Sequence, residues 1–141
     1  MKHTRVSLRV HCIFSTKDRR PAIPQDLQPR AWAFIGGIAR NLGMKAIAVG
    51  GVTDHVHVLL LLASTIPLAE AMQKIKANSS RWLREQTGKS FQWQEGYAAF
   101  SVSMSHTDAT VAYILNQRKH HERRSFDQEL AAILKKHRME D

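Results

Sequence analysis

Hydrophobic and polar residues alternate along several short stretches of this chain. Apolar side chains fall at every second position in residues 5–16 and again in residues 97–105, which predicts two half-buried strands. Two further apolar runs, residues 44–49 and 54–62, are joined across Gly50-Gly51, a pair typical of a hairpin. The pattern therefore predicts four strands, two of them consecutive.

Elsewhere, apolar residues recur at spacings of three and four, as they do on one face of a helix. This spacing predicts a helix ending near Gly43 and helices over residues 67–87, 107–121 and 126–137. Up to residue 105 the elements follow the order β-α-β-β-α-β, which is typical of an α+β, ferredoxin-like fold. We expect an antiparallel sheet with helices on one face, then a helix bearing Tyr113 and a short last helix, in one domain spanning residues 1–141.

The other face of such a sheet is expected to stay open. In the predicted strands, polar positions fall on that face, because successive side chains of a strand point to opposite sides. The polar side chains gathered there are Arg9, His11, His55, His57, Ser101 and Ser103. We interpret this face as a functional surface.

Charge narrows the choice of partner. The chain has 141 residues, and 21 Lys and Arg against 12 Asp and Glu give a formal net charge of +9. The basic residues concentrate in residues 2–20, 74–90 and 117–138, which favours a polyanion such as nucleic acid, although a solvated basic surface has the same composition. Side chains that could contact DNA are Arg9, His11, Lys74, Lys76, Arg81, Lys119, Arg123 and Arg124.

Several classes of protein are disfavoured. The single cysteine, Cys12, excludes an internal disulfide and a multi-cysteine zinc site. The longest apolar run, residues 56–63, is too short to span a membrane, and the first residues lack the apolar stretch of a signal peptide. We therefore expect a cytoplasmic protein.

The clearest local motif is the pair His55 and His57 within a predicted strand. Residues two apart on a strand point the same way and lie roughly 7 Å apart. Two imidazoles at that separation can share a divalent cation, but histidines on a solvated sheet face are also common without one. No second carboxylate is expected near this strand, which argues against two-metal nuclease chemistry.

A second motif lies in the predicted helix over residues 107–121. Tyr113 and Gln117 are four residues apart and so neighbours on one helix face, away from the apolar stripe that we assign to Val111, Ile114 and Leu115. A phenol can act as a nucleophile when a nearby cation stabilises the phenolate, and an amide oxygen can bind that cation. A surface tyrosine with a wet hydroxyl is the alternative interpretation.

At these positions the chain resembles the HUH endonucleases, and among them the small single-tyrosine, TnpA-like transposases of the insertion sequence 200/605 group. The resemblance lies in Asp54-His55-Val56-His57-Val58-Leu59-Leu60 and in Tyr113-Ile114-x-x-Gln117. It extends to residues 76–83, to residues 93–103, and to His120-His121 followed by Phe126 and Glu129, so it covers nearly the whole chain.

The resemblance implies a specific chemistry. His55, His57 and Gln117 would bind Mg²⁺ or Mn²⁺, and Tyr113 would form a 5′-phosphotyrosine intermediate with single-stranded DNA. It also implies hairpin-bearing element ends as the DNA partner and a homodimer in which the tyrosine helix can complete the partner's metal site. No nucleotide cofactor is implied, since the same tyrosine link drives rejoining.

Other proteins with closely spaced histidines fit less well. Histidine-triad hydrolases would need a histidine where Leu59 stands, and two-histidine phosphoesterases would need Ser or Thr two residues after the first histidine. An RNA-recognition sheet would carry aromatic residues on its open face. A domesticated transposase that binds DNA without cutting it, such as a repressor, remains the alternative function.

Overall fold

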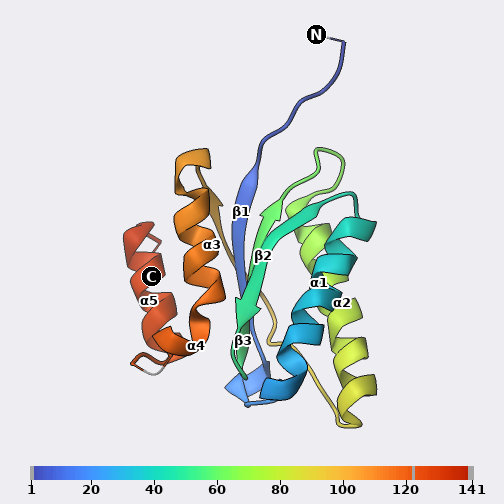
Figure 1. Cartoon of the computed structure of the whole chain (residues 1–141), viewed down its shortest axis with the longest axis vertical. Helices are drawn as coiled ribbons and strands as arrows, with labels where there is room; N and C mark the ends of the chain where they lie inside the picture. The colour runs from blue at the N-terminus through green and yellow to red at the C-terminus, as the bar shows by residue number, and fades with distance from the viewer. Residues whose placement is uncertain (1, 122, 140–141) are drawn as a thin grey trace.

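The fold is a four-stranded antiparallel sheet between two layers of helices (Figure 1). The computed structural model describes residues 2–121 and 123–139. The strands run in the spatial order β2-β3-β1-β4 and comprise β1 (Arg9–Ser15), β2 (Lys45–Gly51), β3 (His55–Leu61) and β4 (Ala98–Val102). The predicted α+β class and the β-α-β-β-α-β order are confirmed.

The helices fall into two groups. On one side of the sheet, α1 (Gln28–Asn41) and α2 (Leu68–Thr87) lie next to each other. On the other side lie α3 (Thr107–Leu115), α4 (Gln117–His120) and α5 (Phe126–Lys136). Within the described residues, no helix is long and apolar enough to cross a membrane.

The larger core lies between the sheet and the α1–α2 layer. Cys12 and Phe14 of β1 and Val58 of β3 pack there against α1 and α2, as the alternation predicted. Ile35 of α1 and Ile75 of α2 are 1% and 0% exposed. Burial of this apolar area is the main stabilising contribution to the fold.

The prediction of an open second sheet face was wrong. Ile114 of α3 packs on Leu59, and Phe126 of α5 packs on Ile13, so helices cover this face as well. As a result β3 is buried on both sides, and His55 and His57 are both 0% exposed. The histidines therefore face the interior between two layers instead of solvent.

The predicted orientation of the last strand was also wrong. Phe100 pairs directly with His11, so both point toward the α3–α5 layer, whereas Ser101 pairs with Val10 on the opposite side. Alternation alone does not distinguish the two faces of an edge strand that carries small residues on both. Phe100 is 4% exposed and is covered by α5.

The predicted hairpin is present, but its glycines lie within β2, and the turn is formed by residues 52–54. A Cβ atom on Gly50 would come within 2.2 Å of the carbonyl oxygen of Ile114. Glycine at this position therefore allows the backbone of α3 to contact the sheet.

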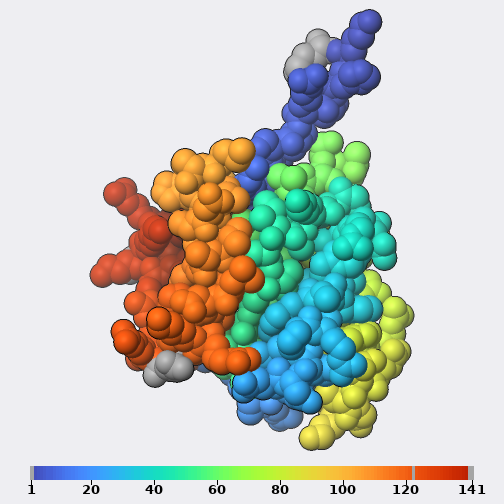
Figure 2. All heavy atoms as spheres, in the orientation of Figure 1, coloured from blue at the N-terminus to red at the C-terminus, as the bar shows by residue number. Residues whose placement is uncertain are grey.

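The predicted tyrosine helix is divided at Asn116 into α3 and α4. Leu115, which we placed in its apolar stripe, is 65% exposed. The last helix begins as predicted, because Ser125 and Gln128 form a reciprocal capping box at its first turn. Residues 2–8 form an extended segment that projects from the body of the molecule (Figure 2).

Candidate active site

The carboxylate of Glu129, on α5, lies at the centre of the candidate site and is nearly fully buried. Its Oε1 atom is 3.0 Å from Nε2 of His57 and 3.2 Å from Nε2 of His55. The Nε2 atom of His121, which follows α4, is also 3.2 Å from the same oxygen. One carboxylate oxygen thus meets three imidazole nitrogens.

Each strand histidine is held through its other ring nitrogen. Nδ1 of His55 is 2.8 Å from Oδ1 of Asp54, and Nδ1 of His57 is 2.7 Å from Nε2 of His11. Partners of this kind orient histidine ligands in metal sites. They direct both Nε2 atoms toward Glu129.

Burial and hydrogen bonding oppose each other in this cluster. Burial by itself would raise the pKa of Glu129, but hydrogen bonds with His55 and His57 hold it well below its ordinary value. Burial would lower the pKa of His55, yet hydrogen bonds with Asp54 and Glu129 raise it to about 9. Burial lowers the pKa of His57 and of His11, for His11 to about 3. The hydrogen bonds therefore favour an ionised Glu129 and a positive charge on His55, whereas burial disfavours a charge on His57.

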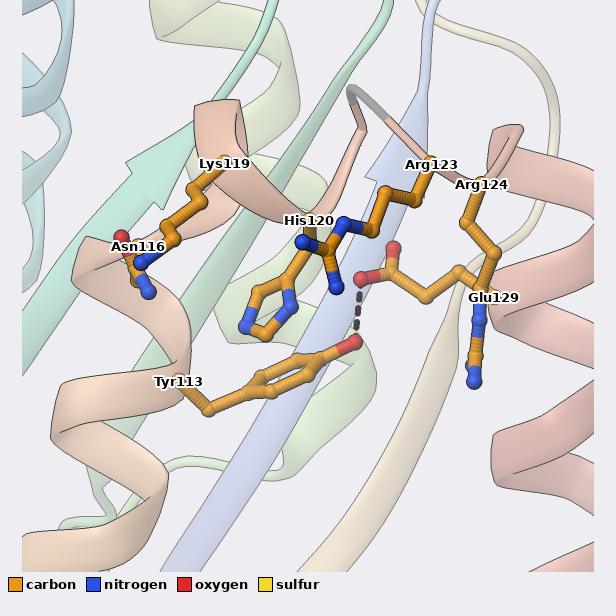
Figure 3. Close-up of a pocket in the computed structure, with 7 residues that line it drawn as sticks. All are labelled: Tyr113, Asn116, Lys119, His120, Arg123, Arg124 and Glu129. Carbon is orange, nitrogen blue, oxygen red and sulfur yellow. Dashed lines mark hydrogen bonds between the residues drawn. The ribbon is translucent and has the colours of Figure 1, made fainter.

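Tyr113 reaches the same carboxylate from α3. Its hydroxyl donates a hydrogen bond to Oε2 of Glu129 (Figure 3). Its ring centroid is 5.8 Å from that of His57. Burial, and then the contact with ionised Glu129, raise the pKa of the phenol. Oε1 of Glu129 thus contacts the histidines, and Oε2 accepts a hydrogen bond from the tyrosine of the same chain.

Gln117 lies where the motif predicted. It is the first residue of α4, is 1% exposed, and its Oε1 atom is 3.2 Å from Nε2 of His55. The structure therefore brings together all four residues of the predicted centre, His55, His57, Tyr113 and Gln117.

The donor set of the cluster fits a divalent cation. One ligand atom each from His55, His121 and Glu129 lie within 4.8 Å of one another. Imidazole nitrogen with carboxylate and amide oxygen suits Mn²⁺ and related ions. This group shares only His55 with the set implied by the resemblance, although His57 and Gln117 adjoin it.

A basic cavity of about 360 Å³ opens beside the tyrosine (Figure 3). The ring of His120 lies over that of Tyr113, with centroids 4.6 Å apart, and its buried Nε2 atom has no hydrogen-bond partner among the described residues. A phosphate oxygen would satisfy that nitrogen. The cavity is lined by Tyr113, Asn116, Lys119, His120, Arg123, Arg124 and Glu129.

The predicted DNA contacts thus divide between two sides of the molecule. Lys119, Arg123 and Arg124 line the cavity, whereas Lys74, Lys76 and Arg81 lie on α2, beyond the sheet.

The five remaining predicted contacts all have partners within the chain, and those of Lys74 and Arg81 are Glu70 and Asn78 of the same helix. Nζ of Lys76 donates to the carbonyl oxygens of Gln94 and Gly96 at 2.7 and 2.8 Å. Arg9 bonds Ser7, and its Nε atom is buried. His11 is 7% exposed and bonded to His57, so it does not lie on a solvated face as we expected.

Sequence reasoning assigned no role to Glu129 or His121, and the expectation that no further carboxylate lies near the histidine strand was wrong. A signal was present: Glu129 falls between Phe126 and Ile133 on the apolar stripe of its helix. An acidic residue on a buried stripe needs a partner, because burying an unpaired charge is costly.

Comparison with known proteins places the chain in a family. No curated protein matches the chain. A crystal structure of a candidate transposase from Deinococcus radiodurans R1 superposes with a TM-score of 0.66 at 23% identity, covering 80% of this chain and 94% of that one. A REP-associated tyrosine transposase bound to a REP hairpin superposes with a TM-score of 0.54 at 16% identity, covering 81% of this chain and 70% of that one. These two likenesses concern the fold, but the profile of the family described as "Transposase IS200 like" matches residues 4–117, and the chain belongs to this family.

Proposed function

We propose that this IS200-like transposase cuts and rejoins single-stranded DNA through a covalent bond between Tyr113 and a 5′ phosphate. The observation that carries the proposal is the hydrogen bond from the Tyr113 hydroxyl to Glu129, whose second oxygen meets the histidine cluster. A nucleophile, a proton acceptor and a set of metal-binding side chains thus lie in contact.

Cleavage at Tyr113 would exchange one phosphoester bond for another. The phenolic oxygen bonds to phosphorus while its proton passes to Oε2 of Glu129, and the bond from phosphorus to the 3′ oxygen breaks. The 3′ oxygen takes a proton from water and leaves as a hydroxyl, and the hydroxide that remains takes the proton back from Glu129, which restores both water and the carboxylate. Attack by a 3′ hydroxyl on the phosphotyrosine reverses the step and rejoins strands, so no nucleotide cofactor is consumed.

His55, His121 and Glu129, with His57 and Gln117 beside them, would hold Mg²⁺ or Mn²⁺. When bound, such an ion polarises a phosphate oxygen and stabilises developing charge. The buried rings exclude water from this side of the phosphate, and Arg123, Arg124 and the free nitrogen of His120 would bind its remaining oxygens.

We also propose a homodimer, as the family resemblance implies. Tyr113 and His57 of one chain already lie together, so we expect each subunit to cut DNA with its own tyrosine.

The test is covalent trapping. Wild-type protein, Tyr113→Phe and the control Tyr97→Phe are incubated with labelled single-stranded DNA from the flanks of the gene, with Mn²⁺ or with EDTA. We expect a protein–DNA band on a denaturing gel for wild type and Tyr97→Phe with Mn²⁺ only. Tyr97 is 40% exposed, which makes it a suitable control.

If the DNA binds under native conditions but no band forms with any variant, the chain is a binding protein such as a repressor. A band with Tyr113→Phe would show that another residue is the nucleophile.

A further inference from the structure

A second and larger cavity, of about 650 Å³, lies on another side of Tyr113. It runs between α3 and α5, and its floor is β4 and the turn that follows it, Met104–His106. Tyr113 and Arg124 line both this groove and the basic cavity. Tyr113 therefore borders two cavities whose other lining residues, apart from Arg124, are different.

The two spaces differ in chemistry. The basic cavity carries Lys119, Arg123 and Arg124, which suit phosphates. The groove has an apolar wall that includes Phe100, Ala109 and Ile133, and none of the described residues that line it is acidic. With Arg124 and Lys136 also in its lining, the groove suits a flat ring that is attached to a polyanion.

Aromatic and hydroxyl groups add to the match. The ring of His137 lies nearly parallel to that of Phe100, with centroids 4.6 Å apart, and offers a surface on which a base can stack. The hydroxyl of Ser103 and Nδ1 of His106 are 2.8 Å apart at the floor, and both can exchange hydrogen bonds with the edge of a base.

We propose that this groove binds the unpaired base of the nucleotide adjacent to the phosphate that Tyr113 attacks, while the neighbouring backbone phosphate lies in the basic cavity. The inference rests on the proposed strand-cleavage function and identifies where its substrate lies. Such a site would select single-stranded DNA, because a base in a duplex would have to break its base pair before it could enter the groove.

The test is a cycle that combines protein variants with missing bases. Ala132 lines the groove, and Ala132→Trp fills it; the preceding residue of the same helix does not line it, so Ala131→Trp is the matched control. A fluorescent single-stranded oligonucleotide from the flanks of the gene is prepared with an abasic site at each position in turn. Its binding is measured by anisotropy in EDTA, where no cleavage occurs.

We expect one position at which loss of the base weakens binding by about tenfold in wild type and Ala131→Trp, in the range of stacking on an aromatic side chain. Ala132→Trp should bind the intact oligonucleotide about tenfold more weakly and show no further loss with the abasic one. With Mn²⁺, wild type should cut next to that position.

The groove assignment would be overturned if the abasic site and Ala132→Trp weakened binding independently of each other. It would also be overturned if the base whose loss weakens binding did not adjoin the cut. If the anisotropy cycle shows the coupling but no covalent band forms with Mn²⁺, the proposed cleavage function fails while the base site stands.

Discussion

The two faces of one sheet carry different kinds of interior. Along β3, Val56, Val58 and Leu60 point to the α1–α2 layer and join an apolar core, whereas His55 and His57 point to the α3–α5 layer and meet a buried carboxylate. Both interiors are buried, but among the described residues only the second holds charged groups. The apolar face thus supplies the stability that allows the second face to keep polar groups, whose burial is costly unless each is paired.

The largest effect is expected on the apolar face. Ile75→Ala removes a fully buried side chain from the α2 side and should lower the free energy of unfolding by about 2–5 kcal/mol, because it leaves a cavity. Chemical denaturation measures this loss. The folded variant should keep its affinity for Mn²⁺, since the residue lies across the sheet from Glu129; a matching loss of affinity would mean that the two faces are not independent.

The histidine face should instead respond to pH. In EDTA, the raised pKa of His55 contributes stability that is present below its unfolded value of 6.5 and is lost as pH rises toward about 9. The free energy of unfolding should fall across this window by at most about 3 kcal/mol. Urea titrations at successive pH values measure the slope.

Glu129→Gln should flatten that slope, because it removes a negative charge that raises the pKa of His55. With saturating Mn²⁺ the free energy of unfolding should instead rise with pH, since metal binding requires neutral imidazoles. An unchanged slope in Glu129→Gln would contradict the assigned cause.

The packing of the tyrosine helix on the sheet gives a smaller effect. Gly50→Ala places a methyl group against the carbonyl of Ile114. It should lower the free energy of unfolding by about 1–3 kcal/mol and displace Tyr113. Gly37→Ala, in α1, meets nothing within 4 Å and should instead stabilise the protein by about 0.4–1 kcal/mol. Thermal unfolding and covalent trapping measure both; equal behaviour of the two variants would mean that the close contact does not position α3.

A specific effect on metal binding is expected for Glu129→Gln, measured by calorimetry. Loss of the carboxylate charge should weaken Mn²⁺ binding by about 10–100-fold. Asp127→Asn, on the same helix, alters only an exposed ion pair with Arg19 and should leave the affinity unchanged. Equal affinities for wild type and Glu129→Gln would remove this residue from the metal site.

The elements that were predicted correctly are those set by local patterns. The alternation in β1, the start of α5 at Phe126 and the shared direction of His55 and His57 depend on neighbours a few residues apart. The errors arose where long-range packing decides. The phase of β4 depends on its register with β1, and the exposure of Leu115 depends on the end of α3 at Asn116.

By itself the sequence determined the α+β order of elements, the shared direction of His55 and His57, and the position of Tyr113 one turn before Gln117, because side-chain periodicity in strands and helices is a local property. The tertiary structure decided that the second sheet face is covered, that Gly50 admits α3, and that Glu129 joins the tyrosine to the histidines. These contacts join residues far apart in the chain, such as the pair His57 and Glu129, separated by 72 positions. No local pattern encodes them, because they form only when whole layers pack together.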